Sequence, residues 1–212
     1  MAFYYPDRGN NDYQLRITDK NGQFIKELLP VDPKSKVLHG LGQNFYVYDG
    51  KLNVFPHFSN TIFSITPDST TQRYHFYFGD YHFPDDEIFQ KKEYNSQAIM
   101  SEIMNNSYVR LMAPYETDEH LLVKYYVKRQ VLLGIYNKKK HTAINLDPEM
   151  VIDSLHLGTF PVPIGFNHNE FIGQLTLDIQ QKNRIMIPEL QKLMADYSED
   201  SNPILIFYSL RS

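Results

Sequence analysis

The chain of 212 residues contains no cysteine and no tryptophan. Without cysteine there are no disulfides, no thiolate nucleophile and no cysteine-ligated zinc site. No apolar stretch approaches the roughly 20 residues that a membrane-spanning helix needs, so we expect no membrane span. The absence of tryptophan weakens the case for a sugar-stacking platform, although Tyr and Phe can take its place.

The charge balance of the chain is slightly negative. Lys and Arg number 21 against 25 Asp and Glu, which gives a formal net charge of -4. Surfaces that bind nucleic acid usually carry clustered positive charge, so we expect no nucleic-acid partner. The N-terminal residues lack the basic segment and apolar core of a signal peptide. The chain therefore carries no targeting signal, and a cytoplasmic location is expected only if it is expressed as written.

The chain is rich in aromatic side chains, with 16 Tyr and 14 Phe, which suit pleated, half-buried surfaces. The clearest strand patterns are residues 60–66 and 73–79, which are joined by a polar turn at 67–70. Two further expected strands, 45–48 and 51–55, come directly before them. Four short strands joined by tight turns predict an antiparallel meander of the size of one propeller blade.

Comparable patterns recur along the chain. Blade-like units cover about residues 1–42, 43–79, 107–146 and 147–212, and a connection with one or two short helices covers 80–106. We therefore predict one all-β domain over residues 1–212. It is a partial β-propeller of three to four blades, built from four-stranded antiparallel meanders with short helical insertions.

The remaining elements are predicted from alternation and turn residues. In the strand at 13–18, Tyr13, Leu15 and Ile17 lie on one face and the residues between them on the other. The pair Asn21-Gly22 predicts a hairpin turn, because it readily supplies positive φ. Other strands are expected at 2–5, 24–29, 108–112, 121–127, 131–136, 142–146, 152–157, 171–177 and 204–210, and a helix is expected to begin at Pro188.

Three segments resemble one known family. They are residues 60–68, residues 74–79 with Phe83 and Pro84, and residues 202–208, and residues 13–30 fit the blade before them. The chain thereby resembles the C-terminal half of the six-bladed β-propeller proteins that are abundant in Bacteroidetes. The resemblance implies a propeller, often exported as an envelope lipoprotein to the periplasm or cell surface, with no assigned activity for most members.

The resemblance also raises the question of completeness. Family members are commonly close to twice this length, and they begin with an export signal and a lipid-accepting cysteine. We therefore expect that the chain is truncated at its N-terminus and that Met1 is not the natural start. Half a propeller exposes sheet edges, which favour pairing with another chain. Self-association through these edges, or marginal stability of the isolated chain, is the expected consequence.

Histidines and charged runs offer candidate chemistry, each with a plainer interpretation beside it. A metal site drawn from His75, His82 and His168 with Asp80 or Asp85 is one interpretation. The spacing lacks the helical His-x-x-x-His pattern, so surface or rim histidines are the favoured interpretation. We expect no metal and no cofactor. The acidic run 85–87 is interpreted as a helix N-terminus rather than an acid/base pair or a calcium site.

Two further charged runs are interpreted as turns. Residues 118–120 are expected to form a solvated hairpin turn, since neighbouring residues cannot present a charge relay and no nucleophile elbow is present. The three lysines at 138–140 are expected to form a soluble turn rather than a site for an anionic polymer. No catalytic residue is assigned.

The candidate ligand-binding residues lie on or near the strands that we place innermost in their blades. They are Tyr46, Tyr48, Tyr108, Arg110 and Tyr115, together with His168. The tyrosines suit stacking on a sugar or peptide at the channel mouth, and ordinary packing between sheets is the alternative. The favoured function is a non-catalytic binding module for a small ligand, glycan, peptide or protein at the channel face. The alternatives are a glycan-processing lyase or hydrolase with a site assembled from several blades, or a fragment without independent function.

Overall fold

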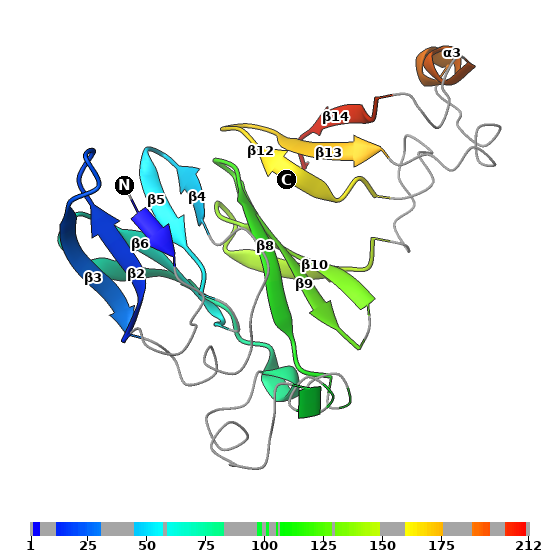
Figure 1. Ribbon diagram of the computed structural model, residues 1–212. Coiled ribbons are helices and arrows are strands. Elements are labelled where there is room, and N and C mark those ends of the chain that lie inside the picture. The colour runs from blue at the N-terminus through cyan, green and yellow to red at the C-terminus, as the bar shows by residue number, and fades with distance from the viewer. Residues whose placement is uncertain are drawn as a thin grey trace. The chain divides into compact units, whose positions relative to one another are not determined.

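The computed structural model describes residues 2–4, 12–30, 45–56, 59–82, 97–98, 101, 105, 107–128, 130–148, 160–175, 188–195 and 202–210. These residues form fourteen strands in four sheets, with few helical segments. Within each sheet, strands that follow one another in the sequence lie side by side (Figure 1). The predicted all-β class and the meander organisation are confirmed.

The first two sheets come from the N-terminal part of the chain. The first has three strands in the order β1 (Ala2–Tyr4), β2 (Tyr13–Thr18), β3 (Phe24–Pro30). The second has four, in the order β4 (Phe45–Tyr48), β5 (Lys51–Val54), β6 (Thr61–Ile65), β7 (Thr70–His75). Neighbouring strands in both sheets are antiparallel. A short 3-10 helix, η2 (Gly79–Tyr81), follows β7.

The other two sheets follow the same plan. The third has the order β11 (Thr142–Leu146), β10 (Gln130–Asn137), β9 (His120–Val127), β8 (Arg110–Glu116). The fourth has the order β12 (Pro163–Phe166), β13 (Phe171–Leu175), β14 (Ile204–Tyr208), and helix α3 (Pro188–Ala195) lies between β13 and β14 in the sequence. The chain divides into two compact units, residues 1–114 with 124–130 and residues 115–123 with 131–212.

Glycine supplies the backbone geometry that two hairpins need. In the β2–β3 turn, Gly22 has a φ of 83°, and the Asp19 carboxylate accepts hydrogen bonds from the backbone N–H groups of Asn21 and Gln23, both at 2.8 Å. The β4–β5 connection is the two-residue pair Asp49-Gly50, with φ values of 51° and 66°. Positive φ at both positions is the requirement of a type I′ turn, whose twist matches that of the strands it joins.

Each unit has its own apolar core. In the first unit, Leu15 and Leu29 from the first sheet pack with Val54 and Ile65 from the second. In the second unit, Leu122, Leu133 and Ile135 pack with Phe171. Burial of such side chains contributes about 25 cal/mol per Å² of apolar surface, and it is what holds one sheet against the next.

A close approach in the second unit requires glycine. A Cβ atom at Gly173 would lie 2.9 Å from Cβ of Pro161 and 3.3 Å from the Tyr208 ring. Tyr208 is held there by its hydroxyl, which donates to the Pro161 carbonyl at 2.7 Å, and by the rings of Phe160 and Phe171. Burial raises the pKa of Tyr208 above its ordinary value, so the hydroxyl stays a donor.

The structure shifts two predicted strands and adds one that was not predicted. The strand expected at 108–112 is β8, Arg110–Glu116. The strand expected at 73–79 is β7, Thr70–His75, because the preceding turn fixes the register with Thr70 opposite Ile65 and His75 opposite Thr61. Strand β12 was not predicted, since its Pro163 and Gly165 disfavour a strand, and it pairs with β13 through a register shift. The expected strand at 152–157 and most of the 80–106 connection lie outside the described residues.

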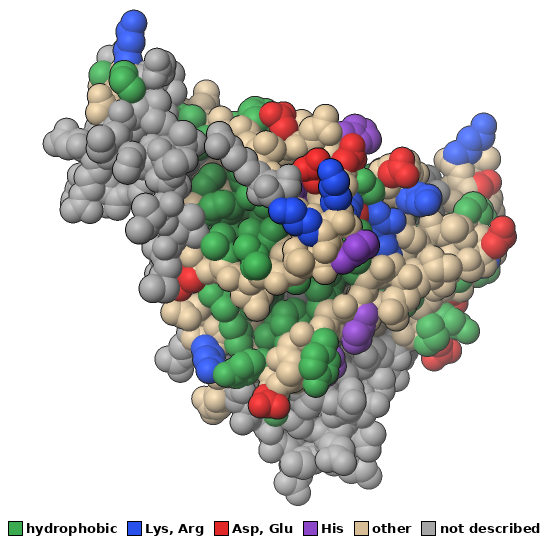
Figure 2. All heavy atoms as spheres, turned by 180° about the vertical axis from the view of Figure 1, so that it is seen from behind, with side chains coloured by type: hydrophobic (Ala, Val, Ile, Leu, Met, Phe, Trp, Pro, Cys, Tyr) green, Lys and Arg blue, Asp and Glu red, His purple; other side chains and the backbone are tan. Residues whose placement is uncertain are grey.

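On the face that Figure 2 shows, charged side chains of both signs and a group of exposed hydrophobic side chains are present. This matches the small net charge of -4. Among the residues that the structure describes, no helix is both long and apolar enough to cross a membrane.

The core assignment gives a first prediction. Phe171→Ala removes a ring that is 0% exposed and should lower the free energy of unfolding by about 3–5 kcal/mol. The matched control is Phe24→Ala, whose ring is 60% exposed and whose loss should cost about 0.5 kcal/mol or less. Urea unfolding followed by circular dichroism measures both. Equal losses for the two variants would contradict the assignment.

Candidate functional site

Two groups of residues combine exposed or polar side chains with a rigid setting, one in each unit. The first, which we call the aromatic turn, is the segment 75–82, which starts at the last residue of β7 in the first unit. The second, which we call the polar turn cluster, consists of the three hairpin turns 116–120, 137–141 and 167–170 in the second unit.

The aromatic turn begins where β7 loses its partner strand. The backbone N–H of Phe76 still bonds to the Asn60 carbonyl at 2.8 Å, and the chain then turns through η2, where Gly79 has a φ of 56°. Phe78 points toward the protein, with its ring 5.3 Å from that of Tyr125. Tyr77 is on the other side and is 82% exposed. The turn therefore exposes the Tyr77 ring and packs the Phe78 ring against Tyr125.

His82 lies beside the exposed ring of Tyr77, and His75 lies beside His82. Nδ1 of His75 and the hydroxyl oxygen of Thr61 are 2.9 Å apart, and the Asn60 amide nitrogen donates to Nδ1 of His82, also at 2.9 Å. The His82 ring lies 6.2 Å from Tyr77 and 6.3 Å from His75. Hydrogen bonds from Asn60 and Thr61 thus hold the two imidazoles, of which His82 lies beside the exposed phenol.

A lysine extends the aromatic turn at its other end. Nζ of Lys128 donates to the Tyr81 hydroxyl at 2.8 Å and lies 4.5 Å from the centre of its ring. The backbone N–H of Val109 bonds to the Tyr81 carbonyl at 2.8 Å. An ammonium group over a tyrosine face is a cation–π contact, worth about 0.5–1 kcal/mol at an exposed site. Tyr81 is therefore held from both its backbone and its side chain.

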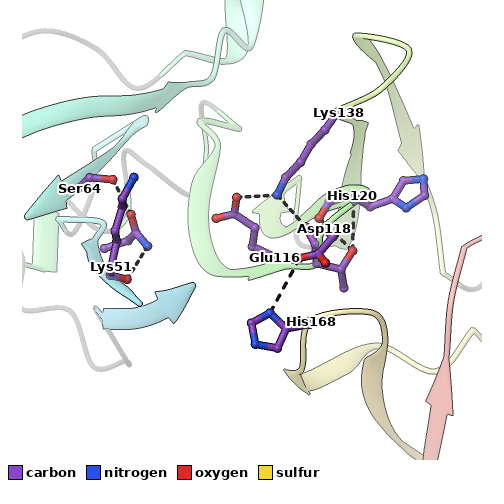
Figure 3. Close-up of polar contacts among 9 residues, drawn as sticks. Lys51, Ser64, Glu116, Asp118, His120, Lys138 and His168 are labelled. Carbon is purple, nitrogen blue, oxygen red and sulfur yellow. Dashed lines mark hydrogen bonds and ion pairs between the residues drawn. The ribbon is translucent and has the colours of Figure 1, made fainter. Parts of the chain in front are cut away.

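The polar turn cluster contains a buried ion pair. The carboxylate of Glu116 is 0% exposed, and Nζ of Lys138 reaches it from the β10–β11 turn at 2.7 Å (Figure 3). The same Nζ donates to the Thr117 carbonyl at 2.6 Å. A buried carboxylate is costly unless its charge is paired and hydrogen-bonded, so Lys138 is required where it lies. The expectation of a soluble lysine turn therefore fits the exposed Lys139 and Lys140 but is wrong for Lys138.

A buried histidine begins strand β9. His120 is 4% exposed, and the Asn137 amide nitrogen donates to its Nε2 at 3.1 Å. Burial lowers the pKa of His120; Glu119 opposes this, and Lys138 and Lys140 add to it. A ring nitrogen that accepts a hydrogen bond belongs to a neutral imidazole, which agrees with the lowered pKa. The expectation of a solvated turn holds for Asp118 and Glu119 and is wrong for His120, because packing covers both faces of β9.

The third turn of the cluster joins the first through Asp118. Its backbone N–H bonds to the His168 carbonyl at 2.8 Å, and its carboxylate lies 3.9 Å from Nδ1 of His168 (Figure 3). Both side chains are exposed, so this pair contributes little to stability. Asn167 shapes the turn, since its Oδ1 accepts from the backbone N–H groups of Asn169 and Glu170.

Three of the predicted ligand-binding residues have identified packing partners. The guanidinium carbon of Arg73 lies over the Tyr48 ring, 5.2 Å from the ring centre. The guanidinium carbon of Arg110 lies over the Tyr126 ring, 4.8 Å from the ring centre. Tyr115 packs against the core of the second unit, and burial raises the pKa of its hydroxyl.

Tyr46 is buried, Tyr108 is half-buried and His168 is exposed. Tyr46, Tyr48, Tyr108 and Arg110 belong to the first unit, and Tyr115 and His168 belong to the second. Their ligand-binding role stays a prediction.

Sequence reasoning did not select Tyr77, Tyr81 or Glu116 as functional candidates. The run Tyr74-His75-Phe76-Tyr77-Phe78 carried a signal, but it was interpreted as a strand. Glu116 and Lys138 are 22 residues apart, and nothing in their local sequence pairs them. Within the described parts of the chain, no group of three or more metal-ligating side chains occurs.

The ion pair gives a second prediction. Lys138→Met removes the ammonium that pairs with the buried Glu116 carboxylate and should destabilise the fold by about 3–5 kcal/mol. The matched control is Lys139→Met, an exposed neighbour, which should change stability by about 0.5 kcal/mol or less. The double variant Glu116→Gln with Lys138→Met should recover part of the loss, because no buried charge remains. Urea unfolding measures all four proteins, and a neutral Lys138→Met would refute the pairing.

His120 gives a third prediction, on pH. Its pKa in the folded protein lies below the 6.5 of an unperturbed histidine, so the unfolded chain binds more protons. The stabilisation is therefore complete above about pH 6.5 and is lost as the pH falls below that value toward the folded pKa. His120→Gln should lose less stability than the wild type between about pH 7.5 and pH 5.5. His168→Gln, at an exposed histidine, should retain the wild-type slope, and identical slopes in all three proteins would contradict the assignment.

The comparisons with known proteins bear on fold and family. A solved structure from Bacteroides fragilis, described as a "putative exported protein", is similar with a TM-score of 0.81 and 18% identity. The match covers 99% of this chain and 62% of that one, so the chain spans less than two thirds of the similar protein, and the likeness concerns the fold alone. A search of curated proteins found no match. The family model described as "Domain of unknown function (DUF4934)" matches residues 1–209, and the chain therefore belongs to this family.

Proposed function

We propose that the chain is a β-propeller-type, non-catalytic binding module, and that the aromatic turn is part of its ligand-binding surface. The propeller is supported by four sheets of three or four consecutive strands, which have the size and strand order of blades. In the two four-stranded sheets the first strands, β4 and β8, lie at a sheet edge. The innermost strand of a blade has that position.

The exposure of Tyr77 is the observation that carries the binding proposal. Large aromatic side chains are normally covered, yet the Tyr77 ring is 82% exposed and has His82 beside it. Phe78 holds the turn by packing on Tyr125. An exposed ring bordered by a hydrogen-bonding group is the usual composition of a site for a ligand with one apolar face and polar edges.

A glycan fits this chemistry best. The C–H face of a sugar ring packs on an aromatic ring, and its hydroxyls bond to imidazole and phenol groups. The net charge of -4 favours a neutral glycan over an anionic polymer. A peptide or protein ligand is the alternative that the test below separates.

An envelope location is part of the proposal. It is supported by the similar protein from Bacteroides fragilis, which is described as exported. Glycans and surface proteins are the ligands that such a location offers. The rival function, a glycan lyase or hydrolase, predicts that a bound oligosaccharide is consumed.

The fourth prediction concerns Tyr77. Tyr77→Ala should weaken binding of a neutral oligosaccharide by about tenfold, since one stacking contact is worth about 1.5 kcal/mol at most. The control is Tyr13→Ala, a partly exposed tyrosine of the same unit, which should bind as the wild type does. An array of neutral and acidic oligosaccharides identifies the probe, and isothermal titration gives the affinities.

The same assay tests the remaining expectations. Tyr48→Ala and Arg110→Ala report on the predicted channel-face residues, and chromatography of the incubated sugar reports on turnover. Equal affinities for wild type and Tyr77→Ala would refute the role of the aromatic turn. No binding to any array member, together with binding to a peptide library, would refute the glycan, and shortened products would favour the enzyme.

A further inference from the structure

The β10–β11 turn, residues 137–141, is closed by the side chain of Asn137, which also contacts the buried imidazole of His120. We propose that this contact makes the turn a pH-sensitive switch in the second unit. The turn is closed while His120 is neutral, and it opens when His120 takes up a proton. The inference concerns a local change of conformation and does not depend on the ligand proposed above.

The orientation of the Asn137 amide is fixed by the backbone of its own turn. Its Oδ1 accepts hydrogen bonds from the backbone N–H groups of Lys139 at 3.0 Å and Lys140 at 2.8 Å. Since a backbone N–H can only donate, the amide oxygen must face the turn and the NH2 group must face His120. Nδ2 of Asn137 lies 3.1 Å from Nε2 of His120, and that ring nitrogen is therefore the acceptor.

Protonation of His120 removes this acceptor. An imidazolium carries a proton on both ring nitrogens, so Nε2 becomes a donor that faces the donor Nδ2 of Asn137. Both residues are buried, which makes the mismatch costly, and hydrogen bonds with Thr117 hold the backbone of His120. Relief therefore comes from Asn137, whose side chain withdraws or turns its amide over. Both movements break its bonds to the backbone of Lys139 and Lys140, and the turn opens.

The rest of the turn depends on this closure. His141 has a φ of 55°, in the left-handed region that a residue with a Cβ atom seldom adopts. Lys138 joins the turn to the neighbouring turn 116–120, since its backbone N–H donates to the Glu119 carbonyl at 2.9 Å and its Nζ pairs with Glu116. Opening of the turn therefore also loosens the contact of Lys138 with the turn 116–120.

The charges around His120 favour its neutral form. Burial lowers the pKa of His120, Glu119 opposes this effect, and Lys138 and Lys140 add to it. Figure 3 shows the imidazole pointing away from the carboxylate of Glu116, which is already paired with Lys138. The remaining titratable side chains of the three turns are those of Asp118, Lys139, His141, His168 and Glu170.

A second turn of the same construction lacks the contact with a buried imidazole. Asn167 closes the turn 167–170 in the same way, because its Oδ1 accepts from the backbone N–H groups of Asn169 and Glu170. Its amide nitrogen lies 3.4 Å from the exposed carboxylate of Glu170 instead. The switch therefore belongs to the turn 137–141 and follows from His120.

A nitroxide label on the turn tests the proposal in the full chain. The chain contains no Cys, so Lys139→Cys gives a single labelling site at an exposed position of the turn. The closed turn holds the pKa of His120 below 6.5 and the open turn restores the ordinary value, so opening takes up one proton. The ratio of mobile to immobile label in the electron paramagnetic resonance spectrum should therefore rise as the pH falls, by up to about tenfold per pH unit.

Two variants of the labelled protein separate the switch from a general loosening in acid. His120→Gln cannot take up the proton and should give a ratio that does not change between about pH 7.5 and pH 5.5. Asn137→Asp keeps one oxygen for the backbone N–H groups and places the other against Nε2, where it accepts from the imidazolium. In this variant the label should become less mobile as the pH falls, and the result decides the question even if His120→Gln does not fold.

The controls are a histidine of the same turn and a label on another turn. His141→Gln removes an exposed histidine and should retain the wild-type rise. A label at Lys20→Cys reports on the β2–β3 turn, which Asp19 closes, and should not respond over this range. Circular dichroism spectra confirm that each variant is folded.

Three results would overturn the proposal. The first is a wild-type label whose mobility does not change with pH, or changes equally at Lys20→Cys. The second is a rise that persists in His120→Gln or disappears in His141→Gln. The third is an Asn137→Asp variant that responds to acid as the wild type does.

Discussion

The register of the strands is the constraint on which the rest of this structure depends, and side chains in the turns fix it. Asp19, Thr66, Asn137 and Asn167 each use a side-chain oxygen to accept a hydrogen bond from a backbone N–H two to four residues further on. Such a bond closes the turn locally, before any distant contact forms. A slip by one residue would move every side chain of a strand to the opposite face. Four short polar residues thereby decide which apolar side chains reach the core.

In this register some strands are buried on both faces, and the buried polar side chains on them need hydrogen-bonding or ionic partners. In the first unit, Asn53 is buried between sheets; its Oδ1 accepts from the Ser64 hydroxyl at 2.7 Å and its amide donates to the Lys51 carbonyl (Figure 3). In the second unit, Glu116 takes Lys138 as its partner. An unpaired polar group at either place would cost about 1–3 kcal/mol, and more for a charge. The buried polar groups therefore make the register more specific, since a shifted strand would leave them without partners.

Short strands and their turns could be predicted from the sequence, whereas contacts between residues far apart in the sequence could not. Strands β2, β4 and β11 were predicted to the residue, because alternation and turn residues are local signals. The prediction of a turn with positive φ at Asn21-Gly22 was also confirmed for Gly22. Strand β12 was missed, since its proline and glycine are tolerated only because β13 lies beside it. The pairing of Glu116 with Lys138 and the burial of His120 arise from packing between turns that local patterns do not relate.

The aromatic turn shows why a strand-like composition at 73–79 led to a predicted strand that is too long at its C-terminal end. The run that follows Arg73 has the composition of a strand, but a strand needs a partner. Strand β6 is five residues long, and its first residue, Thr61, already pairs with His75. Beyond that point, Phe76 keeps one backbone hydrogen bond, to Asn60, and the chain leaves the sheet.

The aromatic residues that would have extended β7 take different positions. Phe78 packs its ring against Tyr125, and Tyr77 exposes its ring to water. The length mismatch between two paired strands thus puts the Tyr77 ring into water beside His82, which a hydrogen bond from Asn60 holds in place. Because the Phe78 anchor and this hydrogen bond position the turn before a ligand arrives, less entropy is lost when the ligand stacks on Tyr77.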